Sequence, residues 1–279
     1  MSARPATGHD ARSLPLRLRH ALWRRGKALR QRVLPRPVAQ HVFVAGMQRS
    51  GTNLLMDVLD ASLATQVFHE TDPRAFDRYE MRDLPVIRQL AQASPAPVFV
   101  IKALCELDRI RALMDTFSPA KTLWMVRDWR DSASSAVKSF GNFVPQWKRL
   151  AHGDADDWRG HGMSPATREL LAALYHADAS EAEGAAIMWF YRNVLFFEQL
   201  LAADPRVRLV FYEDLVRDPG REVAAMYDFL GLPVNAAMAG RIHARSVKHR
   251  APADISPAVT ALCDELLARF RALAGGARQ

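Results

Sequence analysis

Short apolar runs alternate with polar turns and amphipathic stretches along most of the chain. Because these runs are rich in β-branched residues and each is followed by a polar turn, they are expected to be buried strands of a parallel sheet. Four strand-and-turn units in succession favour helices on both faces of that sheet. The pattern predicts one α/β domain with a central, mainly parallel sheet. The expected strands are 42–45, 65–68, 98–101, 122–126 and 207–212.

Helical spacing of apolar residues fills most of the chain between these runs. Gly231 is expected to end one helix, and Ser164 to cap another before Pro165. The segment 213–220 is predicted to be a turn. The expected helices begin at residue 54 after the first strand and then cover 74–92 with a break near Pro85, 107–117, 132–140, 165–176, 181–201, 221–230 and 257–273.

Two regions depart from this pattern. Residues 1–36 form a basic extension in front of the domain, which is expected to cover 37–279. The extension allows a basic amphipathic helix for a membrane surface or nucleic acid, and a solvated, partly disordered arm is the interpretation that we favour slightly. Residues 141–164 lack a clear period and are predicted to be a substrate loop or lid. In that loop Trp147 and Trp158 would either stack on a substrate ring or pack the loop itself.

Composition narrows the classes of partner. The 279 residues suit one sizeable domain, and a formal net charge of +8 favours anionic partners. Neither a run of about eighteen apolar residues nor a secretory leader pattern is present. The two cysteines, Cys105 and Cys263, cannot form a disulfide framework, which fits a reducing compartment. We therefore expect a cytoplasmic protein that can be peripheral to a membrane.

The turn after the first strand has the features of an anion site. Val42–Ala45 is followed by a small polar turn from Gly46 to Thr52 and then by helical spacing. Such a turn presents backbone N–H groups, and the helix N-terminus adds the positive end of its dipole. The alternative is a tight turn that carries an exposed arginine, Arg49.

This turn resembles the nucleotide-binding pattern G-x-x-x-x-G-K-S/T only in part. Gly46 and Gly51 have the right spacing, but Thr52 stands at the lysine position and Asn53 at the position of the magnesium ligand. The cradle is therefore like that of a P-loop nucleotide-binding protein, without the groups that hold a metal and a γ-phosphate. We expect a phosphate or sulfate ester to bind here without a metal.

Charged residues also follow the other expected strands. His69 and Glu70 follow the second strand, Lys102 ends the third, and Arg127–Asp131 follow the fourth. The carboxyl ends of parallel strands lie along one edge of a sheet, where ligands of α/β proteins bind. Cations at that edge would bind a ligand with several anionic groups. The alternative for Arg127 and Arg130 is ion pairing with Asp128 and Asp131 on a solvated turn.

At this point the sequence resembles a known family, the sulfotransferases that use 3′-phosphoadenosine 5′-phosphosulfate (PAPS). Their first motif, a strand followed by K/R-S-G-T, is matched by Arg49-Ser50-Gly51-Thr52. Their second is matched by Arg127, Asp128, Arg130, Asp131 and Ser135. A third resemblance is Tyr212-Glu-Asp-Leu215 followed by Phe229-Leu-Gly-Leu232. The resemblance covers most of 41–140 and 207–232.

The resemblance implies roles for these residues. The first turn, with Ser50, Gly51, Thr52 and Asn53, would cradle the 5′-phosphosulfate, and Arg127 with Ser135 would hold the 3′-phosphate. An arginine can grip a phosphate with two hydrogen bonds. Lys248 and Arg250 would close over the nucleotide, as basic C-terminal segments do in the family, or are solvated.

Arg49 stands at the position of the family's first-motif cation. An arginine does not give up a proton, so Arg49 is expected only to stabilise charge that develops on the leaving phosphate. Lys102 either stabilises the sulfonate or is a surface lysine at a strand end.

The catalytic base is the point at which the sequence departs from the family. Its cytosolic branch places a histidine two residues after the lysine that ends the third strand, whereas Lys102 is followed here by Ala103 and Leu104. Carbohydrate-type and many bacterial members rely on a glutamate instead. Glu70 is the candidate and His69 its rival. The alternative for Glu70 is a structural ion pair with Arg74 or Arg78.

These observations predict an enzyme that moves a sulfuryl group from PAPS to a hydroxyl or amine acceptor by metal-independent, in-line transfer. The acceptor, a glycan or a lipid among others, is left open, membrane-surface contact through the basic N-terminus is allowed, and no specific nucleic acid is expected. One alternative is a small-molecule kinase of the P-loop class, which would need magnesium. The other is a non-catalytic basic module that binds nucleic acid or membrane.

Overall fold

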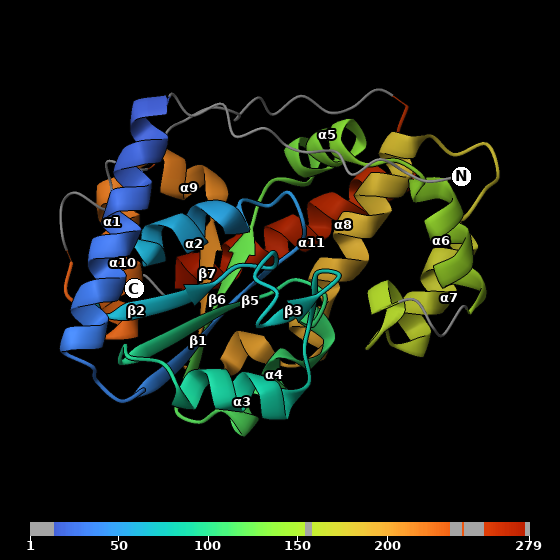
Figure 1. The fold of residues 1–279 in the computed structure, drawn as a ribbon. Helices are drawn as coiled ribbons and strands as arrows, with labels where there is room; N and C mark the ends of the chain where they lie inside the picture. The colour runs from blue at the N-terminus through green and yellow to red at the C-terminus, as the bar shows by residue number, and fades with distance from the viewer. Residues whose placement is uncertain (1–13, 154–157, 235–241, 243–253, 277–279) are drawn as a thin grey trace.

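The computed structural model is built on five parallel strands in the order β2-β5-β1-β6-β7, with helices on both faces (Figure 1). It describes residues 14–153, 158–234, 242 and 254–276. The strands are β1 (Gln40–Gly46), β2 (Thr65–Phe68), β5 (Val98–Ala103), β6 (Ala120–Val126) and β7 (Val207–Phe211). Each lies within two residues of its predicted bounds, which confirms the predicted α/β fold with a parallel sheet.

Alternation of apolar residues along the strands divides the core between the two faces of the sheet. In β1, Val42 and Val44 face one layer of buried side chains, whereas Phe43 and Ala45 face the other. The first layer comes from α2 (Thr52–Asp60), α9 (Tyr212–Arg217) and α10 (Pro219–Leu230). The second comes from α3 (Leu84–Gln92), α4 (Ile110–Thr116), α5 (Trp129–Ser139), α6 (Phe143–His152), α7 (Pro165–Leu174), α8 (Glu181–Glu198) and α11 (Pro257–Gly276).

Three predicted segments have a different structure. Residues 74–83 are not helical but include a short antiparallel hairpin, β3 (Phe76–Asp77) and β4 (Glu80–Met81). The segment 213–220, predicted to be a turn, contains α9 and the start of α10. The first half of the predicted loop 141–164 is mainly helix α6, which packs on α8.

The smaller predictions on helix ends are confirmed. Ser164 caps α7 by accepting a hydrogen bond from the backbone N–H of Thr167. Gly231 ends α10 with a φ of 68°, which glycine adopts without a steric penalty. The described residues also include three short 3₁₀ turns: Leu107–Arg109, Trp158–Gly160 and Leu201–Ala203. In the described part of the chain, no helix is both long enough and apolar enough to cross a membrane.

From residue 14 on, where the structure describes it, the basic extension is not a solvated arm. Residues 14–33 form helix α1 (Leu14–Val33), which packs beside α2 and β2 at the edge of the sheet (Figure 1). Lys27 is buried, and its Nζ donates to Oδ1 of Asp60 at 2.9 Å and to the backbone O of Asp60 at 2.8 Å. Arg24 donates to Oδ2 of the same carboxylate at 2.9 Å. Asp60 therefore anchors the helix.

We expect Asp60→Asn to destabilise the docked helix in a pH-dependent way. Burial alone would raise the pKa of Asp60, but Lys27 and Arg24 outweigh it and hold the pKa below its usual range. A carboxyl with a lowered folded-state pKa contributes stability above the unfolded-state pKa and loses it as the pH falls through the folded-state value. The free energy of unfolding should drop by about 2 kcal/mol at pH 7, and this loss should shrink below pH about 4.

Urea unfolding of the full chain at pH 7 and pH 3 checks this prediction. Asp77→Asn is the control, because Asp77 lies exposed on the β3–β4 hairpin. A loss for Asp60→Asn that does not change with pH would assign the anchoring to packing rather than to charge.

Candidate functional site

The turn between β1 and α2 is held in a conformation that only glycine allows at two points. Gly46 has a φ of 142°, and a Cβ on it would lie 2.6 Å from the backbone O of Met125 in β6. Gly51 has a φ of 102°, and a Cβ there would lie 2.5 Å from Cδ2 of Tyr212. The turn is therefore pressed against β6 and against the residue that follows β7.

The N-terminus of α2 is suited to an anion. Gly51 is its N-cap and offers no side-chain hydrogen bond, and the first turn carries no acidic residue. The first N–H groups of a helix have no partner within the helix and point along its axis, where the positive end of the dipole lies. Thr52 and Ser50 are buried there, and Ser50 Oγ donates to the backbone O of Met47 at 2.6 Å.

Three residues predicted to bind the cofactor converge beside this turn. Arg49 Nε donates to Ser135 Oγ at 3.0 Å, across 86 residues of sequence. Arg127 donates from its NH1 nitrogen to the backbone O of Arg49 at 3.0 Å. The structure thus brings together the first-motif and second-motif groups, from the ends of β1 and β6.

The electrostatics of this corner favour an anionic ligand. Burial lowers the pKa of Arg49, and the nearby charge of Arg127 lowers it further. Both effects mean that keeping Arg49 charged beside Arg127 costs free energy. An anion placed between the two guanidinium groups removes that cost and adds charge-assisted hydrogen bonds.

Arg127 is positioned by residues to which the sequence analysis assigned no role. Its guanidinium lies over the Tyr212 ring, 4.5 Å from the ring centre, and its backbone O accepts from Trp189 Nε1 at 3.0 Å. The next residue, Asp128, donates its backbone N–H to Glu213 Oε1 at 2.9 Å. The motif at 212–215 was a usable signal for Tyr212 and Glu213, whereas no pattern pointed to Trp189.

The end of β5 carries a buried ammonium group rather than a surface lysine. Lys102 is 1% exposed, and its Nζ donates to Glu70 Oε2 at 2.6 Å and to Asn53 Oδ1 at 2.5 Å. Burial lowers the pKa of Lys102, and the Glu70 carboxylate opposes that shift. The three side chains come from β5, from the residues after β2 and from the first turn of α2.

The two candidate bases have different surroundings. Glu70 contacts Lys102, so its alternative pairing with Arg74 is wrong; Arg74 pairs with Asp72 at 2.6 Å. His69 instead lines a cavity with residues of α1, among them Arg24 and Lys27. Burial lowers the pKa of His69, which favours the neutral imidazole at pH 7.

The remaining predicted positions differ in outcome. Arg130 pairs with Asp264 of α11 at 2.7 Å and reaches Asp128 only at 4.0 Å, so its strongest partner lies far along the chain. Trp147 is buried against α7 and donates to the backbone O of Leu171, so it packs the protein and is not a stacking platform. Lys248 and Arg250 lie outside the described residues.

Comparisons with known proteins show which family model and which folds the chain matches. The model of the sulfotransferase domain family matches residues 39–250. A sulfotransferase domain from the curacin biosynthetic pathway shares the fold at a TM-score of 0.51 and 14% identity, covering 83% of this chain and 98% of its own. A sulfotransferase from Alicyclobacillus acidocaldarius does so at 0.50 and 18%, covering 85% and 95%. No curated protein sequence matches the chain.

Proposed function

The chain belongs to the sulfotransferase family, and on that premise we propose that it transfers a sulfuryl group from PAPS to a hydroxyl or amine acceptor without a metal. The observation that carries the proposal is the convergence of Arg49, Ser135 and Arg127 beside the N-terminus of α2. PAPS has two anionic ends, a 5′-phosphosulfate and a 3′-phosphate. A ligand of that kind needs two neighbouring anion sites, and the residues that follow β1 and β6 would supply them.

The residues of the turn fit the 5′ end of such a nucleotide. The first backbone N–H groups of α2 would donate hydrogen bonds to the phosphate, and Thr52 would add a hydroxyl donor. Ser50 would add a second one by turning its hydroxyl away from the backbone O of Met47. Arg127 and Ser135 would hold the 3′-phosphate, with Tyr212 keeping the Arg127 guanidinium in place. When bound, PAPS supplies an activated sulfuryl group and a phosphate that leaves with its negative charge.

Arg49 and Lys102 would stabilise that charge. Both are fixed before the ligand binds, Arg49 by Ser135 and Lys102 by Asn53 and Glu70, so little reorganisation is needed during transfer. Asn53 occupies the position at which a P-loop kinase carries its magnesium ligand, and its oxygen accepts from the Lys102 ammonium. An ammonium in that place supports charge stabilisation by side chains rather than by a metal.

Glu70 would be the base that takes the proton from the acceptor. Its carboxylate lies against Lys102, at the same edge of the sheet as the anion site. A carboxylate at this position is a side chain of the kind that can act as a general base. His69 is the weaker candidate because it faces the cavity beside α1.

Titration with 3′,5′-adenosine bisphosphate (PAP), the product nucleotide, tests the proposal. In buffer with a chelator we expect micromolar binding by calorimetry, and Arg127→Ala should weaken it about 100-fold, since charged hydrogen bonds contribute roughly 1.5–3 kcal/mol. Arg130→Ala is the matched control. It removes the same charge from the same turn, but the Arg130 guanidinium is paired with Asp264.

Two results would contradict the proposal. One is no PAP binding by the wild-type chain together with binding of ATP that requires magnesium, which would favour a P-loop kinase. The other is an equal loss of affinity in Arg127→Ala and Arg130→Ala. That result would mean that affinity depends on the positive charge of the region and not on a specific contact of Arg127. Binding as expected justifies a screen of hydroxyl and amine acceptors with sulfur-labelled PAPS.

A further inference from the structure

The net positive charge of the protein comes from its first forty residues. They contain ten lysines and arginines and one acidic residue, Asp10, whereas the chain has 38 basic and 30 acidic residues in all. Residues 1–40 thus carry a net charge of +9 (10 minus 1), and residues 41–279 carry −1 (28 minus 29). The described part of this basic segment is mainly helix α1, so the charge is presented at one edge of the fold.

Helix α1 has two opposite faces with different chemistry. The face with Trp23, Lys27 and Gln31 is docked, since these side chains donate to backbone or side-chain oxygens of Asp60, Leu63 and Thr65. Such residues, four apart, lie on one side of a helix. The docked face therefore uses polar groups, in contrast to the usual helix that buries its apolar stripe.

The apolar stripe of α1 faces solvent instead. Leu22, Leu29 and Val33 are 61%, 65% and 68% exposed. They are seven and four residues apart, which places them close to one line along the helix, and at about 100° per residue that line lies on the side away from Lys27. Scattered exposed apolar residues are ordinary, but a stripe on a helix indicates a surface that is covered by something.

Arginines border this stripe on both sides. Arg25 and Arg32 fall on one flank and Arg30 on the other at helical spacing, and all three are exposed. They are additional to Arg24 and Lys27, whose charges are engaged by Asp60. An apolar line with arginines on both flanks is the arrangement of a helix that lies in the plane of a membrane interface.

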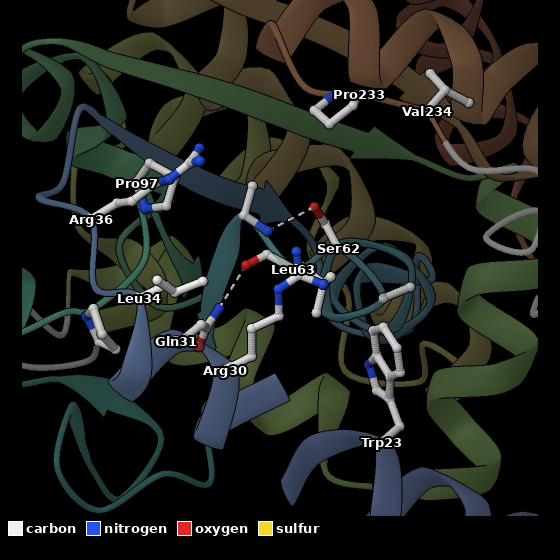
Figure 2. A pocket seen from close by; sticks show the side chains of 13 residues that line it. Trp23, Arg30, Gln31, Leu34, Arg36, Ser62, Leu63, Pro97, Pro233 and Val234 are labelled. Carbon is white, nitrogen blue, oxygen red and sulfur yellow. Dashed lines mark hydrogen bonds between the residues drawn. The ribbon is translucent and has the colours of Figure 1, made fainter. Parts of the chain in front are cut away.

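A cavity of about 410 Å³ lies beside the docked face of α1, where Trp23 and Gln31 form part of its wall (Figure 2). Leu34, Leu63 and Val234 line it and are themselves partly or largely exposed, and Arg30 and Arg36 contribute the charge. Figure 2 shows Gln31 hydrogen-bonded to the backbone O of Leu63, which joins the end of α1 to the wall of this cavity. The cavity is thus separate from the exposed stripe of α1.

We propose that the solvent-facing side of helix α1 forms a docking surface for a bilayer that contains anionic lipids. Leu22, Leu29 and Val33 would enter the boundary between headgroups and acyl chains, and the flanking arginines would contact lipid phosphates while their stems remain apolar. The positive charge of the helix favours an anionic lipid surface over the other partners that could cover the stripe. A second copy of the chain would bring another positive segment of +9 to the same surface, and nucleic acid would leave the apolar stripe in water.

Co-sedimentation of the full chain with vesicles tests the proposal. Vesicles of phosphatidylcholine with about a third phosphatidylglycerol should bind the protein at least tenfold more tightly than phosphatidylcholine alone, and added salt should reduce this preference. Leu29→Ser should weaken binding about tenfold, because burying one leucine contributes roughly 1.5 kcal/mol. Leu200→Ser is the matched control, since Leu200 is 72% exposed but lies after α8, outside helix α1.

The opposing results are equally specific. Equal binding of Leu29→Ser and Leu200→Ser to anionic vesicles would overturn the role of the stripe. Binding that prefers single-stranded RNA over vesicles would make the surface a nucleic-acid site, and concentration-dependent dimers without vesicle binding would make it a self-association surface. PAP titration of Leu29→Ser keeps this test separate from the proposed function, because loss of lipid binding with intact nucleotide binding concerns α1 alone.

Discussion

Glu70→Gln is expected to lower the turnover number by about 10²- to 10⁴-fold, the usual contribution of a positioned general base. The substitution keeps the size of the side chain and an oxygen that can accept from Lys102, so the buried ammonium group retains a partner. The affinity for PAP should change little, because Glu70 is not among the groups proposed to hold phosphate. A large loss of turnover with intact nucleotide binding would place Glu70 in the proton transfer.

The pH profile distinguishes a base from a residue that only positions Lys102. A general base must be deprotonated to act, so it gives the pH–rate profile an acidic limb. In Glu70→Gln that acidic limb should disappear from the residual activity. Labelled PAPS and the best acceptor from the screen supply the measurement.

His69→Gln is the companion variant. It removes the rival base, since the His69 imidazole lies next to Glu70 and lines the cavity beside α1. We expect less than a tenfold change in turnover. A reversed result, with His69→Gln inactive and Glu70→Gln active within tenfold, would assign the proton transfer to the imidazole and leave Glu70 as the ion-pair partner of Lys102.

The strands were predictable from the sequence because their signal is local. Each is a short apolar run that ends in a charged or glycine-bearing turn, and burial on both faces leaves no other place for such runs. The hairpin at 76–81 was missed because two-residue strands carry no periodic signal. Helix α6 was missed because glycines and aspartates on either side obscured ten residues of helical spacing.

The site was predictable to the extent that it follows from topology. Arg49 and Arg127 end adjacent parallel strands, β1 and β6, so their proximity follows from the strand order. The bond between Lys102 and Asn53 and the stacking of Arg127 on Tyr212 depend on side-chain packing between distant segments. Local patterns hold no information about such pairs.

The docking of α1 shows the same limit. Its composition indicated a solvated basic arm, because arginines dominate and the apolar residues are few. Asp60 reverses that expectation, since one buried carboxylate at the end of α2 accepts from both Arg24 and Lys27. A charge pair across more than thirty residues is decided by the fold, and hydropathy patterns cannot indicate it.

Arg49→Ala is expected to lower the turnover number by about 10²- to 10³-fold, the effect of removing one donor that stabilises transition-state charge. Arg49 is already held toward the site by Ser135, and its lowered pKa reflects burial beside Arg127. Under the proposed function, this positive charge would lie where negative charge grows on the leaving phosphate. Affinity for PAP should weaken less, about tenfold or below, because Arg127 and the amides of α2 remain.

Arg49→Lys and Ser135→Ala separate charge from geometry. Lysine restores the charge but not the planar fork, so partial recovery of turnover is expected. Ser135→Ala removes the oxygen that accepts from Arg49 Nε and should weaken PAP binding while the charge at residue 49 is kept. If Arg49→Ala instead raised KM with an unchanged turnover number, Arg49 would bind ground state and transition state equally, and the stabilisation of the leaving phosphate would have to come from Lys102.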